Sequence, residues 1–286
     1  MVTEWYDAHI HFFYPHPNKE ILAVLRDLEE KRLAGFDALA FGEIPSDLEM
    51  ILTMVPKAYH ENITPQVLEH QKDPFPVIKQ AAPLKIIPFA DARFVQKDAY
   101  QKVRGFKQRG FQGLKLLYVP EGEVELQIGG MEKAFGRPVK ESENVTGLLI
   151  EGASSHGMPV LFHADLKKYG EFVEEMIRSH PDTNFNIPHF GSSRKAISAL
   201  METYPNCYTD LSSLIPAMER DPDAYRNFII DYQDRILFGS DGVIGWPEHV
   251  ASTLRCVRRF LEGGEVLEKL MNRNYLKFHQ IPGGAQ

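Results

Sequence analysis

The sequence is poor in cysteine, with only Cys207 and Cys256 among its 286 residues. Two isolated cysteines cannot build a disulfide framework, and neither belongs to a Cys-x-x-Cys motif. No run reaches the roughly 18 apolar residues needed to cross a membrane, and no basic-then-apolar signal segment is visible. We therefore expect no membrane contact and a reducing, cytoplasmic compartment.

Long runs of like charge are absent as well, and the net charge is −7. Nucleic-acid-binding surfaces need an excess of Lys and Arg, so no nucleic-acid partner is expected. The composition, 43% hydrophobic and 25% charged, is that of an ordinary globular protein. A small-molecule substrate is the expected partner, and a homo-oligomer is left open.

Apolar runs alternate with amphipathic stretches along the whole chain. Eight strands, each followed by a helical segment, predict a parallel sheet covered by helices. This number and length match a single-domain α/β protein, a (β/α)₈ TIM barrel over residues 1–286. An open doubly wound sheet would normally have a Gly-rich loop after its first strand, where this chain has His-Ile-His-Phe-Phe. The predicted strands are Trp5–Phe12, Phe36–Ile44, Lys85–Arg93, Phe111–Tyr118, Met158–His163, Asn184–His189, Asn206–Leu211 and Arg235–Gly239.

Local signals mark the first helices. Gly35 stands where a glycine would end the first amphipathic stretch, and residues 46–49, Ser-Asp-Leu-Glu, have the form of a capping box. Two connections, residues 45–84 and 119–144, are long. Both follow strand ends, so we expect them to act as lids or binding loops on the face where barrel active sites lie.

Metal-ligating side chains follow several of these strands. His9 and His11 are two apart in a strand and point to the same side. His163, His189 and Asp241 lie at the ends of later strands. Because the carboxyl ends of all barrel strands open onto one face, we expect the five to meet. They suit one or two ions of Zn²⁺, or of Mn²⁺, Fe²⁺ or Co²⁺, which would lower the pKa of a bound water to about 7.

These motifs resemble the amidohydrolase superfamily, and within it the amidohydrolase-2 branch, which contains aminocarboxymuconate-semialdehyde decarboxylase, lactonases and hydratases. The resemblance covers nearly the whole chain. One departure is Trp246-Pro247, several residues beyond Asp241, where many relatives place an aromatic-Pro pair directly after the aspartate. The matching segments are residues 7–11, 110–116, 159–163, 189–191, 236–241 and the closing helix 270–278.

The resemblance implies roles for particular residues. His9, His11, His163 and Asp241 would bind the metal, with Asp241 also the general base. His189 would bind a second metal, or polarise the substrate and shuttle a proton. Lys115 would be a carboxylated bridge between two metals. It could instead be a free ammonium that binds a substrate carboxylate, or pair with a buried acid such as Asp241.

Further polar residues on the same face are candidates for substrate binding. Arg93 ends the third predicted strand and could hold a substrate carboxylate, or pair with Asp91. Tyr118 could contact substrate or pack under the loop that follows it, and His249 could contact substrate as well.

The predicted function is metal-dependent hydrolysis of a small anionic ester, lactone or amide by a metal-activated water. The alternative is a metal-dependent lyase, a decarboxylase or hydratase acting on an unsaturated or aromatic carboxylic acid. A barrel that only binds a ligand is disfavoured, because the ligand set for a polarised water is intact. The acidic balance also disfavours a nuclease.

Overall fold

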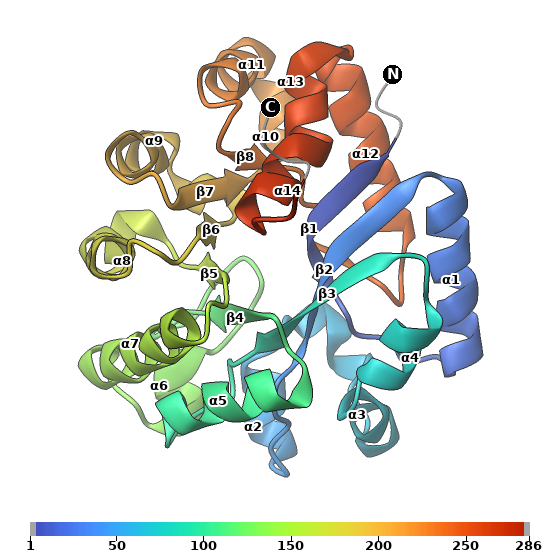
Figure 1. The fold of residues 1–286 in the computed structure, drawn as a ribbon. Helices are drawn as coiled ribbons and strands as arrows, with labels where there is room; N and C mark the ends of the chain where they lie inside the picture. Colours follow the sequence, from blue (N-terminus) through green and yellow to red (C-terminus); the bar gives the residue numbers. More distant parts are fainter. Residues whose placement is uncertain (1–3, 283–286) are drawn as a thin grey trace.

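In the computed structural model, which describes residues 4–282, nine parallel strands form one sheet that curls around a central axis (Figure 1). The order across the sheet is β8-β7-β6-β5-β4-β3-β2-β1-β9. The strands are β1 (Trp5–His11), β2 (Leu33–Phe41), β3 (Lys85–Asp91), β4 (Gly113–Leu117), β5 (Val160–His163), β6 (Phe185–Ile187), β7 (Cys207–Asp210), β8 (Ile236–Leu237) and β9 (Gly242–Val243).

Helices surround the sheet, as Figure 1 shows, and pack their apolar faces against it. None of the described helices is long and apolar enough to span a membrane. The helices are α1 (Asn18–Glu30), α2 (Leu48–Thr53), α3 (Pro65–Gln71), α4 (Phe75–Gln80), α5 (Ala99–Arg109), α6 (Gly130–Phe135), α7 (Val139–Ser155), α8 (Leu166–Ser179), α9 (Arg194–Thr203), α10 (Ile215–Arg220), α11 (Pro222–Asp231), α12 (Glu248–Leu261), α13 (Gly264–Glu268) and α14 (Asn274–Phe278), with short 3₁₀ or π turns η1 (Lys57–Asn62), η2 (His189–Ser192) and η3 (Lys269–Arg273).

The eighth strand of the barrel is divided into two short pieces. β8 pairs with β7, whereas β9 pairs with β1. Residues 238–241 join the two pieces, and the Ala8 amide donates to the carbonyl of Phe238 over 2.9 Å. The interrupted strand thus links the last strands to the first, and the predicted (β/α)₈ architecture is confirmed.

Strand β1 contains a bulge beside the His-x-His pair. Asp7 is in register with Phe36 and Ile10 with Ala38, so three steps on β1 face two on β2. A bulge of this kind redirects the side chains that follow it and is common next to active sites. Here the irregularity spans Asp7 to Ile10 and so includes His9.

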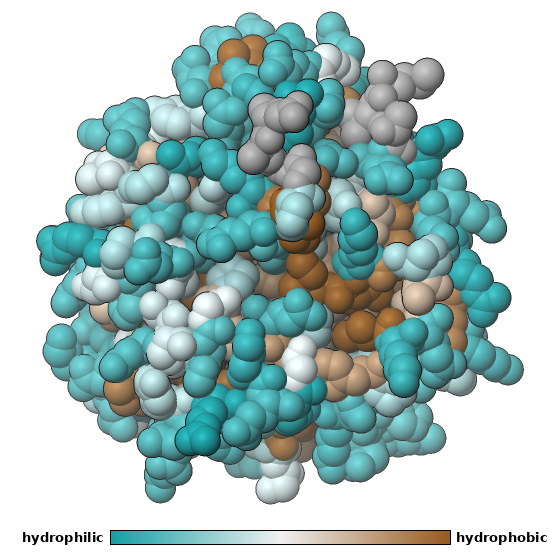
Figure 2. All heavy atoms as spheres, in the orientation of Figure 1, coloured by the Kyte–Doolittle hydropathy of each residue, from teal (hydrophilic) through white to brown (hydrophobic). Residues whose placement is uncertain are grey.

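The end of the barrel where β1 begins is closed by α14. The ring of Tyr275 stacks on Tyr6 with 4.6 Å between centroids, and its hydroxyl donates to Asp37 over 2.7 Å. His279 Nε2 lies 2.9 Å from the same carboxylate. In Figure 2, hydrophobic side chains show beside the C-terminal end in an otherwise mostly hydrophilic face.

Some local predictions were wrong in detail. Gly35 does not end a helix: α1 ends at Glu30, Arg32 takes the left-handed conformation (φ 69°), and Gly35 lies inside β2. A Cβ at residue 35 would lie 2.2 Å from the carbonyl oxygen of Lys85, so glycine is needed for the close approach of β2 and β3. At residues 46–49 the cap is Asp47, which accepts from the amides of the following turn.

Replacing Gly35 with alanine should therefore lower the free energy of unfolding by about 2–3 kcal/mol, because backbone atoms of two strands must move apart. The matched control is Gly105→Ala in α5, where an added Cβ meets no atom within 4 Å. That variant should gain about 0.5–1 kcal/mol from reduced chain entropy. Urea denaturation measures both, and equal stability of the two variants would contradict the prediction.

Candidate metal centre and cavity

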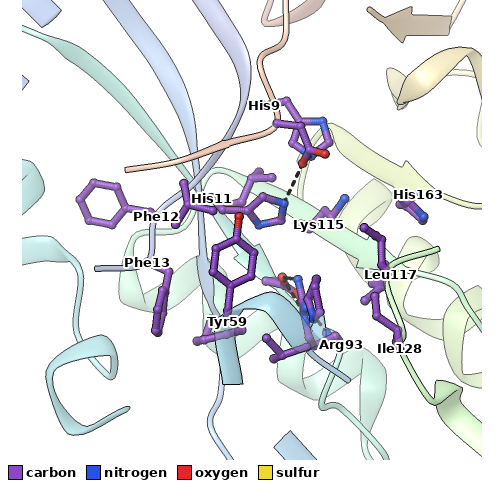
Figure 3. A pocket seen from close by; sticks show the side chains of 18 of the residues that line it. His9, His11, Phe12, Phe13, Tyr59, Arg93, Lys115, Leu117, Ile128 and His163 are labelled. Carbon is purple, nitrogen blue, oxygen red and sulfur yellow. Dashed lines mark hydrogen bonds and ion pairs between the residues drawn. The ribbon is translucent and has the colours of Figure 1, made fainter. Parts of the chain in front are cut away.

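His9, His11 and Asp241 converge at the carboxyl end of the barrel. Figure 3 shows the two histidines at the cavity. Oδ1 of Asp241 lies 3.2 Å from His9 Nε2 and 3.1 Å from His11 Nε2. One ligating atom from each residue lies within 4.8 Å of the others. Asp241 takes a left-handed conformation (φ 57°), a strained backbone state that is concentrated at functional sites.

The environment of His9 fits a divalent ion. Its Nδ1 lies 3.1 Å from Asp210 Oδ2, which places the ring proton on Nδ1 and leaves the Nε2 lone pair toward Asp241. Burial lowers the pKa of His9 to about 4, so the imidazole is neutral. Nε2 is buried without a hydrogen bond in the described structure. Such an atom requires a partner, and a cation beside Asp241 supplies one.

Asp210, which the sequence analysis missed, holds this region in place. Its carboxylate also accepts from Asn186 Nδ2 (2.9 Å) and from the amides of Ser212 (3.1 Å) and His189 (3.2 Å). Burial alone would raise the pKa of Asp210, but the neighbouring imidazoles and hydrogen bonds hold it well below its usual value. Its place at the end of a predicted strand was the signal that could have identified it.

Asp7 connects the His-x-His strand to the residues before Asp241. Its Oδ1 accepts from the amides of His9 and Ser240, both over 3.0 Å. Burial raises the pKa of Asp7 to about 8, which favours a protonated carboxyl near neutral pH. Asp7 therefore holds the backbone of His9 and of the residue directly before Asp241.

His189 lies next to the three converging residues. Its Nε2 is 3.9 Å from Asp241 Oδ2, and its ring centroid is 5.3 Å from that of His9. The serine at position 212 orients the ring, since Ser212 Oγ lies 2.8 Å from His189 Nδ1. His189 can thus reach the outer oxygen of Asp241.

His163 lies further from the His9–His11 pair, on the far side of Lys115 in Figure 3. Its ring centroid is 5.3 Å from that of His189. It does not belong to the three-residue group within 4.8 Å. Its Nε2 instead lies 3.4 Å from Oε2 of Glu123, a residue that sequence reasoning also missed. Burial lowers the pKa of His163 to about 4.

These residues open onto a cavity of about 230 Å³. Both long connections line it, as expected of binding loops. The amide of Lys57 donates to Leu126 O (3.2 Å), which joins one connection to the other. Most of the wall is apolar. From residues 45–84 come Val55, Pro56, Ala58, Tyr59 and Ile63, and from residues 119–144 come Leu126 and Ile128.

Lys115 is fully buried in β4 and lines the same cavity. Among the described residues its ammonium makes no hydrogen bond and no ion pair within 4.0 Å, so the predicted alternative of a pair with Asp241 is not formed. Burial lowers the pKa of Lys115 to about 8, although Asp91 and Asp241 oppose the shift. A cation without a partner beside a cavity favours an anionic occupant.

Arg93 lines the cavity but its guanidinium is already engaged. Nε donates to Asp91 Oδ2 over 2.9 Å and Nη1 to the carbonyl of Met54 over 3.0 Å. Burial would raise the pKa of Asp91, but Arg93 holds it below its usual value. The structure thus shows the ion pair that was the alternative to substrate binding.

Tyr118 and His249 are not brought to the cavity, in contrast to their predicted role. Side chains alternate along a strand, and Lys115 and Leu117 face the cavity, so Tyr118 faces the helices. Its ring packs 5.1 Å from that of Phe172. His249 is exposed on α12.

Tyr59 takes an unpredicted place at the cavity. Its hydroxyl end points toward the centre of the cavity, in the direction of His11 (Figure 3). Trp246 packs on Tyr59 at 5.4 Å and on Phe13 at 6.2 Å. Trp246, which lies several residues after Asp241 and not directly after it, therefore supports the cavity wall.

The family model described as Amidohydrolase matches residues 6–274, and the chain belongs to this family, whose members are generally metal-dependent. No curated protein matches the sequence. Solved structures that share the fold include an Agrobacterium tumefaciens protein in its apo form (TM-score 0.60, 10% identity, 96% of this chain and 95% of that chain). An uncharacterised TIM-barrel protein of Bordetella bronchiseptica matches with a TM-score of 0.57 and 14% identity, over 98% of this chain and 99% of that chain. The phosphotriesterase homology protein of Escherichia coli was solved with phosphate in its active site. It matches with a TM-score of 0.57 and 10% identity, over 98% of this chain and 100% of that chain.

We expect Asp210→Asn to weaken divalent-ion binding about 10–100-fold, because the carboxylate that orients His9, a candidate ligand, is lost. The control is Asp182→Asn, an exposed carboxylate in the loop before β6. Calorimetric titration of the metal-free proteins with Zn²⁺ measures the change, and wild-type affinity in Asp210→Asn would refute the role given to Asp210.

Proposed function

We propose that this protein is a metal-dependent hydrolase of a small anionic molecule with an ester, lactone or amide bond. The observation that supports this most directly is the buried Nε2 of His9, which has no hydrogen bond and faces Asp241 and His11 beside a cavity. Two imidazoles and a carboxylate are a donor set that suits Zn²⁺ and similar ions.

His9, His11 and Asp241 would hold the ion, with His163 and His189 as further candidates. The ion would polarise a substrate carbonyl and acidify a water molecule. The two carboxylate oxygens of Asp241 then have separate tasks. Oδ1 faces the two imidazoles, whereas Oδ2 accepts a 2.8 Å hydrogen bond from Ser213 and lies 3.9 Å from His189 Nε2.

Oδ2 of Asp241 is thus the atom placed to take the proton from the attacking water. The oxygen of that water forms a bond to the carbonyl carbon, and the carbon–oxygen or carbon–nitrogen bond to the leaving group breaks. The leaving group must regain a proton. His189 is placed to receive the proton from Oδ2 and deliver it, which is general acid–base catalysis by a carboxylate–imidazole pair.

Lys115 would bind the negative charge of the substrate. Its ammonium has no competing partner, whereas the guanidinium of Arg93 is held by Asp91. We therefore assign carboxylate recognition to Lys115 in preference to Arg93. The apolar wall that the two long connections provide would accept the rest of the molecule.

The same arrangement supports a lyase as the second candidate. Aromatic side chains, including Phe12, Phe13, Phe41 and Tyr59, line much of the cavity. An aromatic or unsaturated acid would pack against them with its carboxylate on Lys115. Release of CO₂ from the substrate would identify a decarboxylase. Cleavage into two products that together contain the atoms of the substrate and one water molecule would identify the hydrolase.

Lys115→Met should raise KM for a carboxylate substrate about 10–100-fold, as expected for loss of a charge-assisted bond of about 1.5–3 kcal/mol. KM for the neutral methyl ester should stay unchanged. The wild-type preference for the anion should decline as pH rises through about 8, because the Lys115 ammonium loses its proton there. Lys57→Met, an exposed lysine near the cavity, is the control.

Metal content is measured alongside these kinetics. A carboxylated Lys115 that bridges two ions would instead show itself as loss of metal in Lys115→Met. Equal KM values of wild type and Lys115→Met for the anion would refute the recognition role.

His189→Ala should abolish turnover and keep the bound metal, because His189 lies outside the three-residue group that we expect to hold the ion. Elemental analysis of the purified variant gives the ratio of metal to protein. Loss of about half of the metal would show a binuclear site, and wild-type turnover would exclude a catalytic role of His189.

A further inference from the structure

A short hairpin brings a carboxylate to the candidate metal centre. Glu123 and Ile128 pair antiparallel, with both backbone hydrogen bonds 2.9 Å long. We call residues 123–128 the roof hairpin, because Leu126 and Ile128 line the cavity. The amide of Gly129 donates to Thr53 O over 2.8 Å and fixes the base of this hairpin against α2.

The carboxylate of Glu123 is directed at His163. Its Oε2 is buried and lies 3.4 Å from His163 Nε2, longer than a typical hydrogen bond. Among the described residues this oxygen has no other hydrogen-bond or ion-pair partner. His163 lines the cavity, and its Nδ1 has no hydrogen-bond partner among the residues that the structure describes.

The arrangement parallels that of His9. Asp210 faces Nδ1 of His9 and leaves Nε2 toward the centre, whereas Glu123 faces Nε2 of His163 and leaves Nδ1. A carboxylate beside one ring nitrogen of a neutral imidazole keeps the proton on that nitrogen and the lone pair on the other. The two histidines would thus be fixed in opposite tautomers, each by its own acid.

We propose that Glu123 is a positioning residue that fixes His163 with its proton on Nε2 and its Nδ1 lone pair toward the metal centre. The inference rests on the proposed function only in requiring that the centre binds a divalent ion. Because Glu123 belongs to the roof hairpin, the tautomer of His163 depends on that hairpin being seated over the cavity.

Glycines at the base of the hairpin make this dependence testable. Gly122 has a φ of 91°, and a Cβ there would lie 2.6 Å from the carbonyl oxygen of Ile128. Gly122→Ala should displace the hairpin while leaving the Glu123 side chain intact. Gly122→Ala should therefore change the tautomer of His163 in the same direction as removal of the Glu123 carboxylate does.

The tautomer is read directly in the metal-free protein by ¹⁵N NMR with labelled histidine, with His163 assigned from a His163→Gln spectrum. Wild type should show one neutral tautomer protonated on Nε2. Glu123→Gln and Gly122→Ala should show a mixture of tautomers. Glu125→Gln, an exposed glutamate in the same hairpin, should match wild type. An unchanged His163 spectrum in Glu123→Gln would overturn the proposal.

A second measurement tests the direction of the free lone pair. Titration of the metal-free proteins with Co²⁺, followed by visible absorption, should show about 10–100-fold weaker binding in Glu123→Gln than in wild type. Glu125→Gln should bind Co²⁺ as tightly as wild type. Wild-type affinity in Glu123→Gln would overturn the assignment of Nδ1 to the metal centre. If no ester, lactone or amide is hydrolysed while both results hold, the proposed function fails and this inference stands.

Discussion

The candidate site depends on one backbone hydrogen bond, from the Asp241 amide to the carbonyl of His9, 2.9 Å long. It forms where the interrupted eighth strand meets the first, and it joins residues that are separated by almost the whole sequence. A second bond of the same kind runs from Ile244 N to His11 O. Because these bonds fix the backbones of the two strands, the side chains of His9, His11 and Asp241 can meet with little freedom left to lose on binding an ion.

Acidic side chains and imidazoles lie close together in the candidate site. Against the effect of burial, neighbouring imidazoles hold the pKa values of Asp210 and Asp241 well below their usual range, and Asp210 is fully buried whereas Asp241 is partly exposed. Buried charges without compensation are costly. The cavity is lined by the ammonium of Lys115 and by the guanidinium of Arg93, which Asp91 already pairs. A divalent ion would supply the remaining positive charge. The same field would distinguish substrates by their charge before any catalytic step.

The sequence predicted the architecture because alternating strands and helices leave few alternatives, and strand-end histidines are informative in a barrel. It could not place Asp210 and Glu123 as partners, since an acidic residue gives no sign of which imidazole it will face. Arg93 and Tyr118 show a second limit. Their roles depended on a local ion pair and on the alternation within β4, and a shift of one residue along a strand reverses the face. The site residues themselves stay predictions until ion binding is measured.

The closing helix α14 has a consequence for how the chain acquires its structure during synthesis. Tyr275 and His279 bind Asp37, and β9 pairs with β1, so β1 gains its second neighbouring strand and Asp37 its partners only after some two hundred further residues have been made. Contacts between such distant segments form slowly. The early strands therefore emerge from the ribosome with their inner faces uncovered, and chaperone protection during translation would suit a barrel whose first and last strands complete it together.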